Sequence, residues 1–308
     1  MFDPVSFTND AINKVKSNVK GRAIIASSGG IDSSVAAKLV SDALGKESLS
    51  VYIDTGLMRE NETKEVERTF ERLGINYKII EAGNLFIEKL KGITDPELKR
   101  KIIGKTFIEV FEQEAKTFGA EYLIQGTIAP DWIESGGGLR DTIKSHHNVG
   151  GLPTNLNLII YEPLRDLYKD EVRRVADHLG IPSNRQPFPG PGLAVRIIGE
   201  VTKEKLEILR KATSIIENHI PRLDVQAWQY FGILLSDKST GVHGDLRVYG
   251  YTLAIRSVNS IDGMTANFSN IPLDSLGVIS REITNTIPKI NRVVYDITDK
   301  PPATIEWE

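Results

Sequence analysis

Short apolar runs alternate with longer helical segments through the first half of the chain. Strand-like runs occupy residues 22–27, 49–55, 77–80, 121–125 and 158–161. Helical spacing of apolar positions covers residues 32–44, 61–73, 96–118 and 169–179, and a glycine follows each of these segments. Glycine is common just after a helix because it adopts a left-handed conformation without strain. The alternation predicts an α/β fold, in which helices flank a parallel sheet.

A parallel sheet of this kind binds its ligand beyond the carboxyl ends of its strands. In this chain we expect the site in the loops that follow Ser27, Asp54, Gln125 and Tyr161.

Two segments interrupt the alternation. Residues 126–154 are rich in glycine, poor in apolar residues and too long for an ordinary connection, so we predict a lid loop there. A cluster of prolines and glycines spans 187–192, and the following sequence is β-rich around helical segments at 202–219 and 274–286. We therefore predict two domains, 1–188 and 189–308, the second being a smaller α+β domain.

Composition narrows the function classes. The 308 residues are enough for two domains of ~150 residues, and a net charge of −3 argues against a strongly basic nucleic-acid surface. The absence of cysteine excludes disulfides, thiolate metal sites and cysteine nucleophiles. No apolar run reaches the ~20 residues of a membrane span, and no signal peptide is evident. We expect a cytoplasmic protein with neither membrane nor nucleic-acid partners.

The loop after the first predicted strand has the composition of a phosphate site. Gly29 and Gly30 let backbone N–H groups approach an anion, and the following helix adds its positive dipole end and serine hydroxyls. Asp32 would repel phosphates unless a cation intervened, which points to Mg²⁺. The alternative is a tight turn with Asp32 capping the helix. The order strand, loop, helix favours a pocket for phosphate or pyrophosphate.

Two other phosphate loops are excluded. The Gly-Lys-Thr at 104–106 lacks the first glycine of a P-loop, since Lys99 stands in its place. The spacing of Gly29 and Gly30 also fails the dinucleotide-binding pattern, although Asp54 lies at about the distance of a ribose-binding acid.

The run SGGIDSS at 28–34 resembles the loop of ATP-pyrophosphatases, which split ATP between the α and β phosphates and transfer AMP to an acceptor oxygen. Other segments resemble GMP synthetases in particular, and the likeness extends from about Gly21 to Glu308. These segments are VYIDTGLMRENE (51–62), QGTIAPDWIES (125–135), IKSHHNVGGLP (143–153), EPLRDLYKDEVRRVADHLGIP (162–182), PFPGPGLAVRIIGEV (187–201) and KPPATIEWE (300–308).

One expected part is missing. Single-chain GMP synthetases begin with a glutamine amidotransferase domain that uses a cysteine, and this chain has no cysteine. The resemblance therefore implies the separate ATP-pyrophosphatase subunit of a split, archaeal-type enzyme. Such a carbon–nitrogen ligase takes ATP, Mg²⁺, xanthosine monophosphate (XMP) and ammonia, and performs the last step of guanine nucleotide synthesis. Its partner is a glutamine amidotransferase subunit, and its C-terminal domain forms a homodimer.

The resemblance also assigns residues. ATP binding falls to Ser28, Gly29, Gly30, Ile31, Asp32, Ser33, Ser34 and Asp54. Catalysis falls to Asp32 and to the lid residues Asp131, Glu134, Lys144, His146 and His147. XMP binding falls to Arg100, Gln229, Asp245, Lys300 and Glu306.

Physical arguments accompany these assignments. Asp131 and Glu134 are three apart, which places both carboxylates on one side of a helical turn, and we expect Mg²⁺ at Asp32 and Asp131. Lys144 can stabilise charge on the α phosphate, and a neighbouring histidine can handle a proton near pH 7. We do not expect zinc at the two histidines, since no further ligands accompany them. Without the family, a solvated acidic turn would explain Asp131 and Glu134, and an ordinary charged helix face would explain Arg100.

Two rival functions remain. One is another ATP-pyrophosphatase, such as NAD synthetase or a tRNA-modifying enzyme; the missing cysteine, the near-neutral charge and the 300–308 segment oppose it. The other is a nucleotide-binding regulatory module without turnover, which the presence of Asp32, Lys144, His146 and His147 disfavours.

Overall fold

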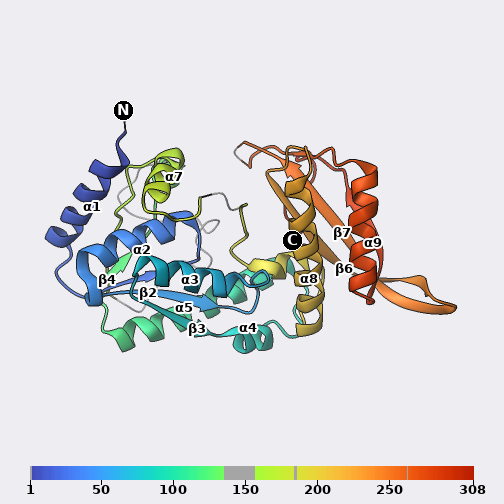
Figure 1. Cartoon of the computed structure of the whole chain (residues 1–308). Coiled ribbons are helices and arrows are strands. Elements are labelled where there is room, and N and C mark those ends of the chain that lie inside the picture. Colours follow the sequence, from blue (N-terminus) through green and yellow to red (C-terminus); the bar gives the residue numbers. More distant parts are fainter. Residues whose placement is uncertain (1, 135–156, 184–185, 262) are drawn as a thin grey trace. The chain divides into compact units, whose positions relative to one another are not determined.

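The computed structural model describes residues 2–134, 157–183, 186–261 and 263–308 (Figure 1). The chain forms two compact units, and each contains segments that are distant in sequence. The first unit comprises Met1–Gly56, Asn61–Gly83 and Ile103–Arg185. The second unit comprises Leu57–Glu60, Asn84–Ile102 and Gln186–Glu308.

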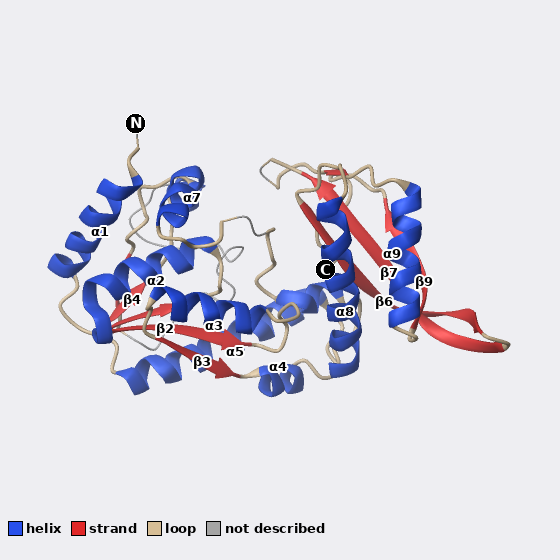
Figure 2. Cartoon of the chain, in the orientation of Figure 1, coloured by secondary structure: helices blue, strands red, loops and turns tan. Residues whose placement is uncertain are grey.

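A parallel sheet forms the centre of the first unit (Figure 2). Its strands follow the order β3-β2-β1-β4-β5, so β1 lies in the middle, with Ala23 opposite both Ser48 and Tyr122. The predicted α/β fold with a parallel sheet is confirmed. The strands are β1 (Ala23–Ala26), β2 (Ser48–Asp54), β3 (Tyr77–Glu81), β4 (Tyr122–Ile124) and β5 (Ile159–Tyr161).

Helices flank this sheet as the apolar spacing predicted. Gly45, Gly74, Gly119 and Gly180 all have positive φ, which confirms glycine's role at the helix ends. The predicted helices are α2 (Ile31–Leu44), α3 (Glu62–Leu73) and α7 (Lys169–His178), and the short α6 (Ala129–Glu134) and η1 (Gly45–Glu47) were not predicted from the apolar spacing. Helix α5 (Pro96–Phe118) begins in the second unit and ends in the first.

The first helix, α1 (Pro4–Asn18), was not predicted. Asp3 caps it by accepting hydrogen bonds from the N–H groups of Val5 and Ser6, both at 3.2 Å. Only Thr8, Ala11 and Val15 are buried on this helix. So small an apolar face gives a weak periodic signal in the sequence.

The core of the first unit fixes where its loops emerge. Strand β2 is buried from Ser48 to Ile53 and becomes partly exposed only at Asp54. Because the strands are parallel, the loops after Ala26, Asp54 and Ile124 leave the sheet at the same edge. This is the edge at which the sequence predicts a ligand.

The second unit is an α+β structure around a mixed sheet. Strand β7 pairs antiparallel with β6 and β8 and parallel with β9. Phe231, Ile233 and Ala254 form one buried cluster of its core, against which Ile305 of the C-terminal segment packs. Its elements are α4 (Gly83–Lys89), η2 (Gly192–Arg196), α8 (Lys203–His219), η3 (Ile220–Arg222), β6 (Gln229–His243), β7 (Leu246–Asn259), β8 (Asn267–Phe268), α9 (Leu273–Thr286) and β9 (Ile290–Asp296).

Among the described helices of both units, none is long and apolar enough to cross a membrane.

Candidate functional site

The loop between β1 and α2 has the geometry of an anion cradle. Gly29 has φ +76°, and a Cβ on it would lie 2.6 Å from Cγ2 of Val66, so this position requires glycine. Gly30 is the N-cap of α2 and provides no side-chain hydrogen bond to the first turn. The N–H groups of the first turn of α2 are therefore not capped by an N-cap side chain. They lie at the N-terminal end of the helix, where the helix dipole favours negative charge.

Serine side chains order this loop. The N–H of Gly30 donates to Ser28 Oγ at 3.3 Å, and Ser33 Oγ donates to the carbonyl of Gly30 at 3.1 Å. The two serine hydroxyls are 3.2 Å apart. These contacts hold the loop in one shape without using the N–H groups of the helix's first turn.

Asp32 is not the cap of α2, contrary to the alternative interpretation of this loop. It lies inside the first turn, where its Oδ2 accepts a hydrogen bond from Lys169 Nζ at 2.6 Å. Its other oxygen, Oδ1, is buried without a hydrogen-bond partner among the described residues. A buried, unpartnered carboxylate oxygen is costly, so this atom is available to a cation or a donor.

Lys169 was missed by the sequence interpretation. It is the first residue of α7, 137 positions after Asp32, and local patterns do not report such a distant pair. Its ammonium group adds positive charge beside the loop, which favours a phosphate ligand there. In the sequence, Lys169 could have been noticed only through the run LYKDE (167–171), which lies in one of the segments that resemble GMP synthetases.

Neighbouring strand ends shape the same edge of the sheet. A Cβ on Gly126, just after β4, would lie 3.1 Å from the backbone of Asp32, so the two loops approach closely. Asp54, at the end of β2, accepts hydrogen bonds from the N–H of Gly56 at 2.8 Å and from Thr63 Oγ1 at 2.7 Å. Both oxygens of Asp54 thus shape the loop after β2.

The predicted lid lies mostly outside the described residues, including Lys144, His146 and His147. The side chain of Glu134 is also outside the described part of the structure. Asp131 is described: its Oδ2 accepts a hydrogen bond from the N–H of Ile128 at 3.0 Å, which is a capping contact at the start of α6.

The fit of this loop to Mg²⁺ depends on Asp32. In the described ranges, no group of three or more acidic or histidine side chains forms a complete metal site. Mg²⁺ in nucleotide enzymes usually takes one or two carboxylates and completes its shell with phosphate oxygens and water. The unpartnered Oδ1 of Asp32 suits that arrangement, as one ligand of a metal that phosphate oxygens and water would complete.

A second cluster forms in the second unit around Glu306. The guanidinium of Arg196 donates two parallel hydrogen bonds to its carboxylate, from Nη2 to Oε1 at 2.7 Å and from Nε to Oε2 at 2.8 Å. Gln229 Nε2 also donates to Oε1 at 3.2 Å. The structure therefore places together two of the predicted XMP ligands, Gln229 and Glu306, and adds Arg196, which the sequence interpretation did not single out.

The start of α5 binds the C-terminal segment. Lys99 is fully buried and forms an ion pair with Glu308, and it also donates to the carbonyl of Ile197 at 2.8 Å. Burial lowers the pKa of Lys99, and the Glu308 carboxylate opposes that shift. Arg100 donates to the backbone carbonyl of Glu308. Arg100, a predicted XMP ligand, is thus held beside residues 306–308.

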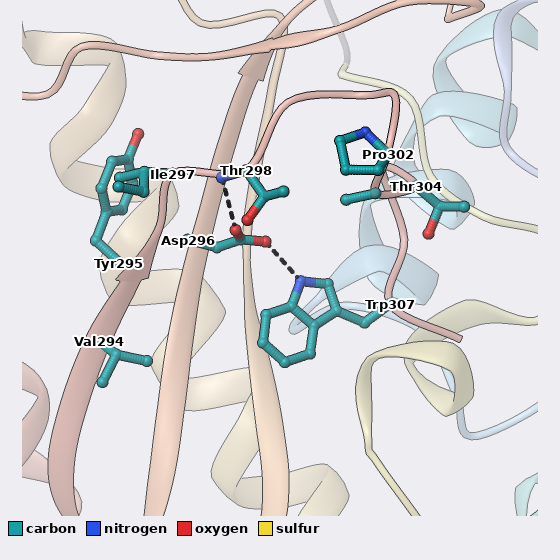
Figure 3. Close-up of a pocket in the computed structure, with 9 residues that line it drawn as sticks. Val294, Tyr295, Asp296, Ile297, Thr298, Pro302, Thr304 and Trp307 are labelled. Atoms are coloured by element: carbon teal, nitrogen blue, oxygen red, sulfur yellow. Dashed lines mark hydrogen bonds between the residues drawn. The ribbon is translucent and has the colours of Figure 1, made fainter.

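A pocket of about 610 Å³ lies beside the same segment (Figure 3). Trp307 Nε1 donates to Asp296 Oδ2 at 2.9 Å, and Asp296 also pairs with the fully buried Arg256 at 3.1 Å. Burial raises the pKa of Tyr295 to about 12, so its hydroxyl stays protonated. The volume is within the usual ~300–1,000 Å³ of small-molecule sites. The pocket is lined by Val294, Tyr295, Asp296, Ile297, Thr298, Pro302, Ala303, Thr304 and Trp307.

The remaining predicted XMP ligands occupy different places. Lys300 is two residues before Pro302, which lines the pocket. Its Nζ donates to the carbonyl of Gly263 at 2.8 Å. Asp245 is exposed in the turn between β6 and β7. Gln229 begins the 15-residue strand β6 and Asp245 follows its far end, so the two residues lie at opposite ends of an extended strand. Within one chain, Asp245 is not brought to Glu306.

Two family models match the chain. Residues 216–307 match the GMP synthase C terminal domain, and residues 5–99 match NAD synthase. The first match covers much of the second unit, and the second match includes the β1–α2 loop.

Relatives match the chain over nearly its whole length. A subunit of glutamine-hydrolyzing GMP synthase from Thermoplasma volcanium is 59% identical, covering 97% of this chain and 99% of that protein. The same subunits from Methanococcus vannielii and Pyrococcus horikoshii are each 55% identical, covering 100% and 98% of this chain and equal shares of their own. Such identity over nearly the whole chain means that the chain belongs to this family of GMP synthase subunits.

Proposed function

We propose that this chain converts XMP to GMP, using ATP and ammonia, as the synthetase subunit of a two-subunit enzyme. The observation that carries the proposal is the 55–59% identity to GMP synthase subunits over both units. The anion cradle at Gly29 and Gly30 is consistent with ATP as a substrate.

The first step is transfer of AMP from ATP to the oxygen on C2 of XMP. The attacking oxygen forms a bond to the α phosphorus, and the bond to pyrophosphate breaks. Catalysis of such a transfer consists mostly of positioning and neutralising the charge of the leaving group. The N–H groups at the start of α2 and the hydroxyls of Ser28 and Ser33 would bind the pyrophosphate, and Lys169 would add positive charge.

The second step is amination. Ammonia attacks C2, the bond from C2 to the adenylylated oxygen breaks, and AMP leaves with that oxygen. Within this proposal Lys144, His146, His147 and Glu134 act from the lid, with Lys144 on the α phosphate. Mg²⁺ bound by Asp32 would neutralise phosphate charge, and Asp131 stays a second candidate ligand.

The acceptor nucleotide would bind in the second unit, close to residues 300–308. Arg100 and Lys300 carry the positive charge that a 5′-phosphate requires, and Glu306 offers a carboxylate to purine N–H groups. The pocket beside Trp307 adds an aromatic side chain and a volume suited to a nucleotide.

The test supplies the chain with ATP, Mg²⁺, XMP and ammonium and measures GMP, AMP and pyrophosphate. We expect equal amounts of the three products, and no GMP when glutamine replaces ammonium, because a chain without cysteine lacks the usual glutaminase nucleophile. Adding the partner glutaminase subunit should restore the use of glutamine. Pyrophosphate without GMP would indicate another ATP-pyrophosphatase, and neither product would indicate a regulatory module.

We also propose that two copies associate through the second unit. Val242, Leu246 and Tyr249 near the β6–β7 turn are each 73% exposed, which is unusual for large apolar side chains clustered on one hairpin. Sedimentation equilibrium should give a dimer mass, and Leu246→Asp should weaken the dimer, whereas Lys289→Asp on a solvated ion pair should not. A monomer at micromolar concentration would contradict this part of the proposal.

A further inference from the structure

We infer that Arg196 is a positioning residue, which sets the carboxylate of Glu306 for the purine of the acceptor nucleotide. The inference rests on the proposed function and adds to it a residue that does not itself touch the substrate. It is carried by three features of Arg196: its burial, its aromatic surroundings and its paired hydrogen bonds.

Arg196 is held in one orientation. Its side chain is 1% exposed. Its guanidinium carbon lies 3.7 Å from the ring centroid of Phe231 and 5.2 Å from that of Phe188, so aromatic rings restrict the cation. Phe188 in turn contacts Arg59, whose guanidinium carbon is 4.8 Å from the same ring. A buried cation in this setting needs a carboxylate partner.

Glu306 is that partner, and its hydrogen-bonding capacity is nearly filled. Oε1 accepts from Arg196 at 2.7 Å and from Gln229 at 3.2 Å, and Oε2 accepts from Arg196 at 2.8 Å. A carboxylate has about four acceptor positions. The contacts of the described residues thus leave about one position, on Oε2, for a donor from outside the chain.

The direction of that free position follows from Arg196. Two parallel N–H bonds fix the plane of the carboxylate as well as its location, and a single point charge fixes neither. Glu306 is the more exposed partner, at 18% against 1%, so the pair presents its carboxylate side towards solvent. The ligand chemistry that fits is a single ring N–H donor, such as a purine presents.

The test compares Arg196→Lys with wild type in the GMP assay, with KM for XMP, KM for ATP and kcat measured separately. Lysine keeps the charge but cannot make both parallel bonds. If the misplaced carboxylate of Glu306 loses its charged hydrogen bond to the purine, KM for XMP should rise about tenfold. We expect KM for ATP and kcat to stay near wild type. The matched control is Arg292→Lys, an exposed arginine of the same sheet, which should change none of the three.

A merely structural Arg196 would behave differently. In that case kcat would fall together with the folded fraction measured by circular dichroism, without a selective rise in KM for XMP. If Arg196→Lys folds poorly, Glu306→Gln decides instead, because it keeps the shape of the side chain and leaves only one oxygen to accept from Arg196. It should raise KM for XMP selectively, and unchanged KM would overturn the inference.

A double variant tests whether Arg196 acts through Glu306. If it does, adding Arg196→Lys to Glu306→Gln should raise KM for XMP no further, whereas independent roles would multiply. If the wild-type protein makes GMP and both single variants keep the wild-type KM for XMP, the positioning role is refuted but the proposed function stands. Wild-type protein that neither converts nor binds XMP in calorimetry would refute the proposed function and the positioning role together.

Discussion

Replacing Asp32 by asparagine is expected to lower kcat for GMP formation by about 100-fold or more, the size of loss seen when one preorganised charge contact at a reacting group is removed. Asparagine has the same shape, so α2 should keep its structure. It removes the negative charge that pairs with Lys169 at 2.6 Å and that is available at Oδ1. Pyrophosphate release and GMP formation should fall together, since both follow the adenylylation step.

Asp42 provides a matched control on the same helix. It also pairs with a lysine, Lys38, at 2.5 Å, but lies far along α2 from the loop. Asp42→Asn should leave kcat unchanged. Raising the Mg²⁺ concentration should partly rescue Asp32→Asn if Asp32 supplies one metal ligand. Wild-type turnover by Asp32→Asn would exclude Asp32 from the reaction.

Removing residues 304–308 is expected to abolish GMP formation at ordinary substrate levels and to destabilise the second unit. The deletion takes away Glu306 and leaves Lys99 buried without Glu308, its carboxylate partner. Loss of one partner from a buried ion pair destabilises a protein by about 3–5 kcal/mol. It also removes the carbonyl of Thr304, to which Arg256 donates at 3.0 Å. Thermal unfolding and GMP assays measure the two effects.

Point variants separate these effects. Glu308→Gln should lower the unfolding temperature with a smaller effect on KM for XMP, since Glu308 faces Lys99 and the N–H of Gly199. Glu306→Gln should act mainly on KM for XMP. A truncated protein with full activity would show that residues 304–308 do not belong to the acceptor site.

The elements predicted best were those with local signals. Strand-like runs, helical spacing and the glycines after helices all depend on residues a few positions apart, and they matched the structure of the first unit closely. The loop at 28–34 was found for the same reason, because its glycines and serines are contiguous.

Contacts between distant residues could not be predicted. Lys169 meets Asp32 across 137 positions, and Arg196 meets Glu306 across 110. Arg196 resembles any other basic residue in the sequence, and only the fold reveals its burial between aromatic rings. The sequence analysis did not predict the individual strands of the second unit, so it did not show that the 15-residue strand β6 separates Asp245 from Gln229.

Helix α5 has a consequence for the design of chimaeras of this chain. Its first residues, with Lys99 and Arg100, belong to the second unit, most of which comes from Gln186–Glu308, while its remainder belongs to the first unit. A recombination event at residue 186 would therefore join a C-terminal portion to a foreign lysine and arginine, or to none. A chimaera that keeps the Lys99–Glu308 ion pair must therefore take residues 84–102 and residues 186–308 from the same parent.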